Sequence, residues 1–130
     1  MTTLPHAFKR IRLNLARSKE FPEGSERHGY EFVAPLDAQG HIDIELWKQY
    51  RGQCRVHRFW GGEGEEHGWL VHRPGGKAGI WKFDYDAATT EDDEAGYRFG
   101  AHAFRTGEYV SIRDEDGEMH TFRVASVERV

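Results

Sequence analysis

Apolar and polar residues alternate with a period of two in several parts of the chain, most clearly in residues 8–15. There the polar residues Arg10, Arg12 and Asn14 are interleaved with three apolar ones, Ile11, Leu13 and Leu15. Successive side chains of a β-strand point to opposite faces, so this pattern predicts a strand with one buried face.

Shorter runs rich in aromatic and β-branched residues, separated by glycine, proline and acidic residues, predict further strands. These runs are residues 28–35, 54–60, 69–73, 80–85, 109–113 and 119–127. Residues 97–104 are also apolar, but the two halves of this segment differ in phase, which favours a short strand followed by a bend. The acidic residues within 87–95 repel one another, which predicts a mobile loop there.

Residues 43–51 are predicted to form the one short helix, with Asp43 as its N-cap. Because Ile42, Ile44 and Leu46 also alternate, a strand is the alternative for this segment. About seven strands with one helix, and no regular alternation of the two, predict a mainly β fold. We therefore expect a single domain over residues 1–130, an antiparallel small barrel or sandwich.

Two hairpins can be assigned a register from the sequence. For residues 69–73 and 80–85, an even sum of paired residue numbers would gather the large side chains on one buried face, namely Trp69, Val71, Trp81, Phe83 and Tyr85. For the last hairpin, a turn at Asp116 and Gly117 pairs Val110 with Phe122.

The C-terminal strands resemble the strand pairs of SH3-like small barrels. The resemblance is carried by FRTGEYVSI at residues 104–112, a turn, and FRV at residues 122–124. It implies that these strands pair within a barrel, and it implies no particular activity because one fold serves many functions.

Composition narrows the class of protein. The single cysteine, Cys54, cannot form an internal disulfide, and residues 1–10 lack the apolar stretch of a signal peptide, so a cytoplasmic location is expected. No run of about 18 apolar residues occurs, so we expect no membrane partner. The formal charge of −4 is split between a net positive first half and a net negative second half. An acidic domain is not favoured as a general nucleic-acid binder.

The eight histidines raise the question of a metal site. No HExxH or CxxC motif is present, and no cofactor is predicted. A site assembled from distant strands remains a candidate, and its members would be His57, His72, Asp84, Asp86 and His102. His67 and His72 are five residues apart and are expected on opposite faces. Cys54 is predicted to be a buried, inert thiol.

Aromatic and arginine side chains supply a second candidate site. Both residue types are favoured at recognition surfaces, and those that could form a ligand-binding cluster are Arg58, Trp60, Arg73, Tyr85 and Arg98.

The leading functional hypothesis is a binding or interaction domain without catalytic machinery, whose partner is a protein or a second copy of itself. One alternative is a small metal-assisted or acid/base enzyme that uses His and Asp side chains. The other is an RNA or single-stranded DNA binder that uses Lys9, Arg10 and Arg12 together with aromatic residues.

Overall fold

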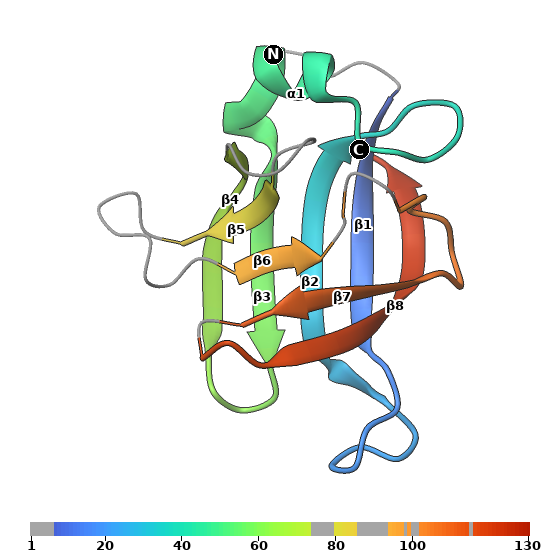
Figure 1. The fold of residues 1–130 in the computed structure, drawn as a ribbon, viewed down its shortest axis with the longest axis vertical. Coiled ribbons are helices and arrows are strands. Elements are labelled where there is room, and N and C mark those ends of the chain that lie inside the picture. The colour runs from blue at the N-terminus through green and yellow to red at the C-terminus, as the bar shows by residue number, and fades with distance from the viewer. Residues whose placement is uncertain (1–6, 74–79, 86–93, 98, 100–101, 115) are drawn as a thin grey trace.

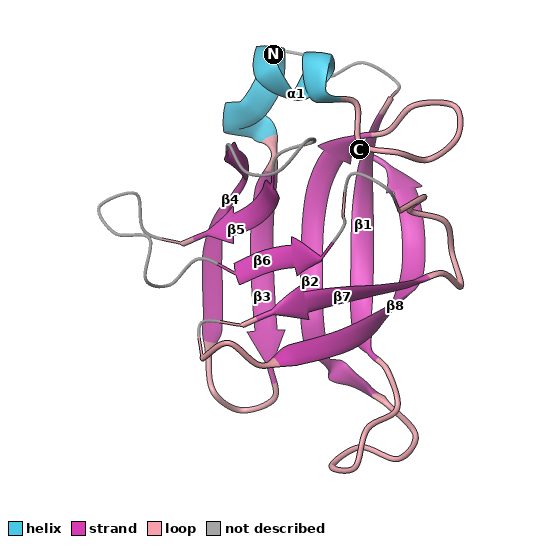
Figure 2. Ribbon diagram, viewed as in Figure 1, coloured by secondary structure: helices cyan, strands magenta, loops and turns pink. Residues whose placement is uncertain are grey.

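The strands of the protein close into one antiparallel barrel (Figure 1, Figure 2). The computed structural model describes residues 7–73, 80–85, 94–97, 99, 102–114 and 116–130. The strands are β1 (Phe8–Leu15), β2 (Ser25–Pro35), β3 (Arg55–Trp60), β4 (Glu65–Arg73), β5 (Ile80–Asp84), β6 (Glu94–Tyr97), β7 (Tyr109–Arg113) and β8 (Met119–Arg129). Each strand pairs with the next, and β8 returns to pair with β1, where Lys9 lies opposite Arg129. The predicted mainly β, antiparallel, single-domain fold is confirmed, and it is a barrel.

The predicted alternation in β1 is confirmed and shows how the wall is built. Ile11 and Leu13 are fully buried, whereas Arg10 and Arg12 lie on the outer face. The guanidinium of Arg12 lies 4.4 Å from the centroid of the Phe59 ring on β3, so the outer face also carries a cation–π contact.

Aromatic rings fill the interior of the barrel. The ring centroid of Phe32 lies 5.3 Å from that of Phe83 and 5.7 Å from that of Phe104. Phe99 packs against Phe104 with centroids 5.1 Å apart in an edge-to-face arrangement, a geometry that adds to the stability gained from burial alone. A Cβ on Gly96 would collide with the Phe99 ring, so glycine in β6 leaves room for that ring.

One end of the barrel is covered by α1 (Ile44–Tyr50), which continues into a short 3₁₀ helix, η1 (Arg51–Gln53) (Figure 1). The predicted N-cap is confirmed, because the side chain of Asp43 accepts hydrogen bonds from the backbone N–H groups of Glu45 and Leu46. Trp47 is buried and donates a 2.9 Å hydrogen bond from Nε1 to the carbonyl of Leu70. No helix in the described part of the chain is long and apolar enough to cross a bilayer.

The register predicted for the β4–β5 hairpin is wrong. Trp69 pairs with Asp84 and Leu70 with Phe83, so the sums of paired numbers are odd. Leu70 is therefore the interior residue, and Trp69 lies outside with the guanidinium of Arg55 5.4 Å from its ring centroid. Gathering the aromatic residues on one face was a misleading criterion, because an outward Trp can be covered by an arginine on the neighbouring strand.

The other hairpin prediction is confirmed, and the loop prediction is partly wrong. Val110 pairs with Phe122 in the β7–β8 hairpin, as the Asp-Gly turn predicts. The loop was expected at 87–95, but Glu94 and Ala95 begin β6, and residues 86–93 lie outside the described residues.

Candidate functional site

A cluster of polar side chains occupies the interior of the barrel at the end opposite α1. Its members come from three strands and one strand end, and they are Tyr30 on β2, Arg58 on β3, Tyr85 just after β5 and Glu94 at the start of β6. Tyr30 and Arg58 are directly opposite partners in the β2–β3 ladder. Arg58 follows Val56 by two residues on β3, and Val56 is buried in the core, so the period of the strand directs the guanidinium inward.

Glu94 is the centre of this cluster. It is only 3% exposed, and its Oε1 accepts a 2.7 Å hydrogen bond from the hydroxyl of Tyr85. Its Oε2 lies 3.7 Å from Nε of Arg58. A buried carboxylate is costly unless hydrogen bonds and an opposite charge compensate for the lost water, and this arrangement supplies both.

Burial sets the proton affinities of these groups. Burial raises the pKa of Glu94, and the Tyr85 hydrogen bond and the charge of Arg58 offset that rise only in part. Burial, followed by the charge of Glu94, raises the pKa of both Tyr85 and Tyr30, so both phenols are neutral in the physiological range. The pKa of Arg58 is lowered by burial and raised by Glu94, and its net direction is upward.

The cluster opens into a cavity of about 340 Å³ between the β3–β4 loop and the β7–β8 turn. Carboxylates dominate its lining, since seven acidic residues face a single arginine. The lining residues are Glu20, Arg58, Trp60, Glu63, Glu66, Tyr85, Glu94, Asp114, Asp116, Glu118 and His120. A cavity of this size is in the range that holds small organic ligands.

A histidine–aspartate pair lines the same cavity. Nε2 of His120 lies 2.9 Å from Oδ2 of Asp114, and Oδ1 of Asp114 accepts the backbone N–H groups of Asp116 and Glu118. Burial raises the pKa of Asp114, but the hydrogen bonds from His120 and from the turn outweigh it and lower the pKa overall. Asp114 therefore holds the turn together and orients His120.

Comparison with known proteins does not assign this site to a family. No protein-family model, no curated protein and no solved structure matches the chain. The chemistry of the cavity is thus the basis on which a function can be inferred.

The structure brings together three of the five residues predicted to bind a ligand. Arg58, Trp60 and Tyr85 all line the cavity. Arg73 lies elsewhere, because its guanidinium forms a 2.8 Å ion pair with Asp84. Arg98 lies outside the described residues.

The residues predicted as a metal site are not brought together. His57 lies on the outer face of β3, whereas the ring of His72 contacts the buried rings of Trp47 and Trp81 near α1. His102 lies in the segment before β7, Asp84 is buried beside Arg73, and Asp86 lies outside the described residues. The parity argument for opposite faces of His67 and His72 is confirmed, and the same alternation separates His57 from His72.

Two other groups of three metal-ligating side chains occur in the described residues, and neither matches the predicted set. They are His57, Glu65 and His67, and Asp114, Glu118 and His120. The expectation for Cys54 is confirmed, because the thiol is fully buried and burial raises its pKa to about 12.

Glu94 is the residue of the candidate site that the sequence analysis missed. It is the last member of the acidic run at residues 91–94, which predicts solvent exposure. The available signal was its position two residues before Gly96, on the same strand face, at the start of an apolar segment.

Proposed function

We propose that this protein is a binding module whose ligand is a small organic cation, an ammonium or guanidinium group, held in the cavity opposite α1. The observation that carries the proposal is the lining of that cavity, which contains seven carboxylates and one arginine. The buried carboxylate of Glu94 forms its floor. A cavity with low-dielectric walls and one sign of charge concentrates ligands of the opposite sign.

The internal charges leave part of this negative potential uncompensated. The positive charge of Arg58 lies 3.7 Å from Glu94 and 3.9 Å from Glu66. In the described part of the chain, Glu20, Glu63 and Asp116 line the cavity without an ion-pair partner. These carboxylates at the rim are placed to attract a cation from solvent.

Trp60 supplies the apolar part of the site. Its ring already accepts the guanidinium of Arg58 at 4.7 Å from the centroid, and it packs edge-to-face with the rings of His28 and His120. A tryptophan face is the strongest aromatic partner for a cation. The cavity therefore offers a ligand both ring surface and carboxylate oxygens.

The same chemistry can reach the cavity from two sources. One is a free amine or guanidine, and the other is a lysine or arginine side chain of a protein partner or of a second copy of this chain. The second source is how the expected protein partner or self-association would use this site.

Titration followed by ¹H–¹⁵N NMR tests the proposal with three probes: 1,4-diaminobutane, N-acetyl-lysine methylamide and, as the anionic control, acetate. We expect shifts of the Trp60 indole N–H and of the β7–β8 turn with the two cations and none with acetate. Salt should weaken the response because the attraction is electrostatic. A stronger response to the lysine derivative would indicate a protein partner, and a stronger response to the diamine a free ligand.

Charge-removing variants at the rim sharpen the test. Glu63→Gln and Asp116→Asn should each weaken the binding of 1,4-diaminobutane several-fold. The matched control is Glu45→Gln, an exposed residue on α1 at the other end of the barrel, which should bind as the wild type does. Equal responses to acetate and diamine, or no shift at Trp60 up to millimolar probe, would refute the proposal.

An acid/base enzyme is the second candidate function, and one observation favours it. Glu94, whose pKa is raised by burial, shares its cavity with the His120–Asp114 pair, and groups of such different proton affinity can act as acid and base. Glu94→Gln separates the two candidates, since it would abolish turnover of a substrate but remove only one of the seven carboxylates that attract a cation.

The remaining expectations stay predictions. A nucleic-acid partner would use the strip at Lys9, Arg10 and Arg12, but Arg10 and Arg12 share the carboxylate of Glu31 at 3.5 and 3.6 Å, which reduces the positive charge available there. The SH3-like arrangement of residues 104–124 and the cytoplasmic location also remain predictions.

A further inference from the structure

The outer wall of the barrel carries three metal-ligating side chains that the cavity does not use. His57 on β3 and His67 on β4 are directly opposite partners in the antiparallel ladder. Their rings are stacked, with centroids 4.6 Å apart and planes only 7° from parallel. Glu65 precedes His67 by two residues, so the alternation of β4 places it on the same outer face.

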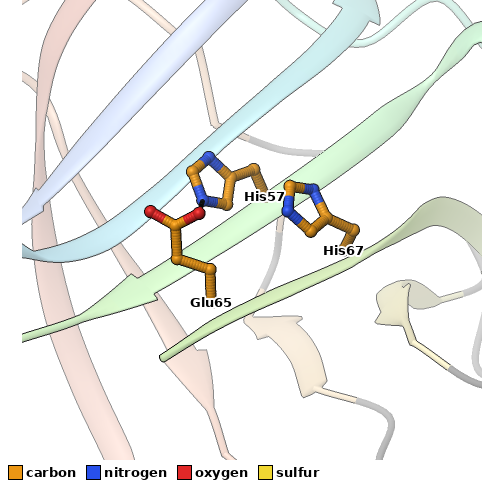
Figure 3. A group of neighbouring side chains, drawn as sticks. All are labelled: His57, Glu65 and His67. Atoms are coloured by element: carbon orange, nitrogen blue, oxygen red, sulfur yellow. Dashed lines mark ion pairs between the residues drawn. The ribbon is translucent and has the colours of Figure 1, made fainter. Parts of the chain in front are cut away.

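The donor atoms of these residues converge. Oε2 of Glu65 lies 3.1 Å from Nε2 of His57, and one ligand atom from each of the three residues lies within 4.8 Å of the others. Figure 3 shows both rings and the carboxylate gathered beside the two strands. In a tetrahedral site with bonds of about 2.0 Å, neighbouring ligand atoms are about 3.3 Å apart, so a small rotation of the side chains brings all three into range.

Nε2 of His57 gives a second, independent observation. This atom is buried from solvent and faces the carboxylate of Glu65 at 3.1 Å, although the geometry is not that of a hydrogen bond. The nitrogen and the carboxylate oxygen are thus held close together without a hydrogen bond between them, an arrangement in which both can donate lone pairs to one cation. A metal ion between them would bind the lone pairs of both atoms.

We propose that His57, Glu65 and His67 bind a divalent transition-metal ion of the Zn²⁺ class on the outer wall formed by β3 and β4. Two imidazoles and one carboxylate are a donor set that Zn²⁺ favours, and three protein ligands leave a fourth position for water or another small donor. Both histidines also line a groove of about 430 Å³, which gives that fourth position access to solvent and small molecules.

The other group of three, Asp114, Glu118 and His120, is less suited to an ion. Both oxygens of Asp114 are already engaged, one by two backbone N–H groups and the other by His120. Binding an ion there would break the hydrogen bonds that form the β7–β8 turn. His120 therefore provides a matched control for the proposed site.

Isothermal titration of the EDTA-treated, dialysed full chain with ZnCl₂ tests the proposal. We expect one Zn²⁺ per chain, and His57→Ala and His67→Ala should each weaken the affinity by at least about 100-fold. Glu65→Gln should weaken it less, and His120→Ala should leave it unchanged. Circular dichroism and thermal melting would verify that each variant is folded, which is expected because both histidines face outward.

NMR of the imidazole nitrogens supplies a readout at the atoms themselves. Zn²⁺ should shift the ring resonances of His57 and His67 and leave those of His41 in place. Absence of Zn²⁺ binding by the wild type, or binding that survives both His57→Ala and His67→Ala, would overturn the proposal.

Discussion

The hydroxyl of Tyr85 donates a 2.7 Å hydrogen bond to Oε1 of Glu94, and this bond joins the end of β5 to the start of β6 inside the barrel. The two residues flank the acidic segment 86–93, so one polar contact fixes both ends of that connection. It also positions the carboxylate at the floor of the cavity.

Removing the Tyr85 hydroxyl should destabilise the protein. Tyr85→Phe leaves Oε1 of Glu94 buried without its donor, and a buried acceptor without a partner costs about 1–3 kcal/mol. Urea denaturation of the variant should show this loss in the free energy of unfolding. Tyr109→Phe is the control, because Tyr109 is exposed and its change should lie within about 0.5 kcal/mol.

Glu94 should make stability fall as pH rises. Its folded pKa lies above the ordinary value of 4.5, so the folded chain keeps a proton that the unfolded chain has lost. The free energy of unfolding of the wild type then decreases from about pH 4.5 up to the folded pKa, by up to about 1.4 kcal/mol per pH unit. In Glu94→Gln this dependence is absent, so the stability difference between the two proteins should change with pH across that window. Parallel stability curves for the two proteins would contradict the burial of an ionisable Glu94.

Gly96 should not tolerate a side chain. In Gly96→Ala the added methyl group meets the ring of Phe99, and overpacking of this kind costs about 1–3 kcal/mol. Thermal unfolding would measure the loss. At Gly52 an added Cβ meets nothing within 4 Å, so Gly52→Ala should change the melting temperature little. Equal effects of the two substitutions would be inconsistent with the packing of Phe99.

Trp47 should hold α1 on the barrel through both its ring and its indole N–H. Trp47→Phe retains part of the ring packing but leaves the carbonyl of Leu70 without its donor, at an expected cost of about 1–3 kcal/mol. Hydrogen exchange should show faster opening of α1 and of the Leu70 region. Trp69→Phe, at an outward position, should leave exchange in α1 as it is in the wild type.

The sequence was sufficient where local chemistry decides the structure. The alternation in β1, the Asp43 cap of α1 and the turn before β8 each depend on residues that are close in the chain, and all three are confirmed. The register of β4 with β5 depends instead on which side chains the rest of the barrel leaves room for. At Gly68 an added Cβ would collide with the backbone of Asp84, a constraint that appears only once the strands are paired.

The candidate sites were harder to predict from the sequence for the same reason. Arg58, Trp60 and Tyr85 share a cavity because the barrel closes around them, and Glu94 joins them from a run of acidic residues that looks solvated. His57 and His67 meet only through the β3–β4 register. Residue types suggested which chemistry to look for, but proximity depended on strand pairing.

The pairing of β8 with β1 has a consequence for how the protein is made. Residues such as Lys9 and Arg129, at nearly opposite ends of the chain, must meet before the ring of hydrogen bonds is complete. Contacts so distant in sequence form slowly, because a long loop has to close first. During synthesis, the edge of β1 that pairs with β8 therefore stays unpaired until β8 has left the ribosome. In that interval the nascent chain presents a free strand edge to other molecules, and the finished barrel does not.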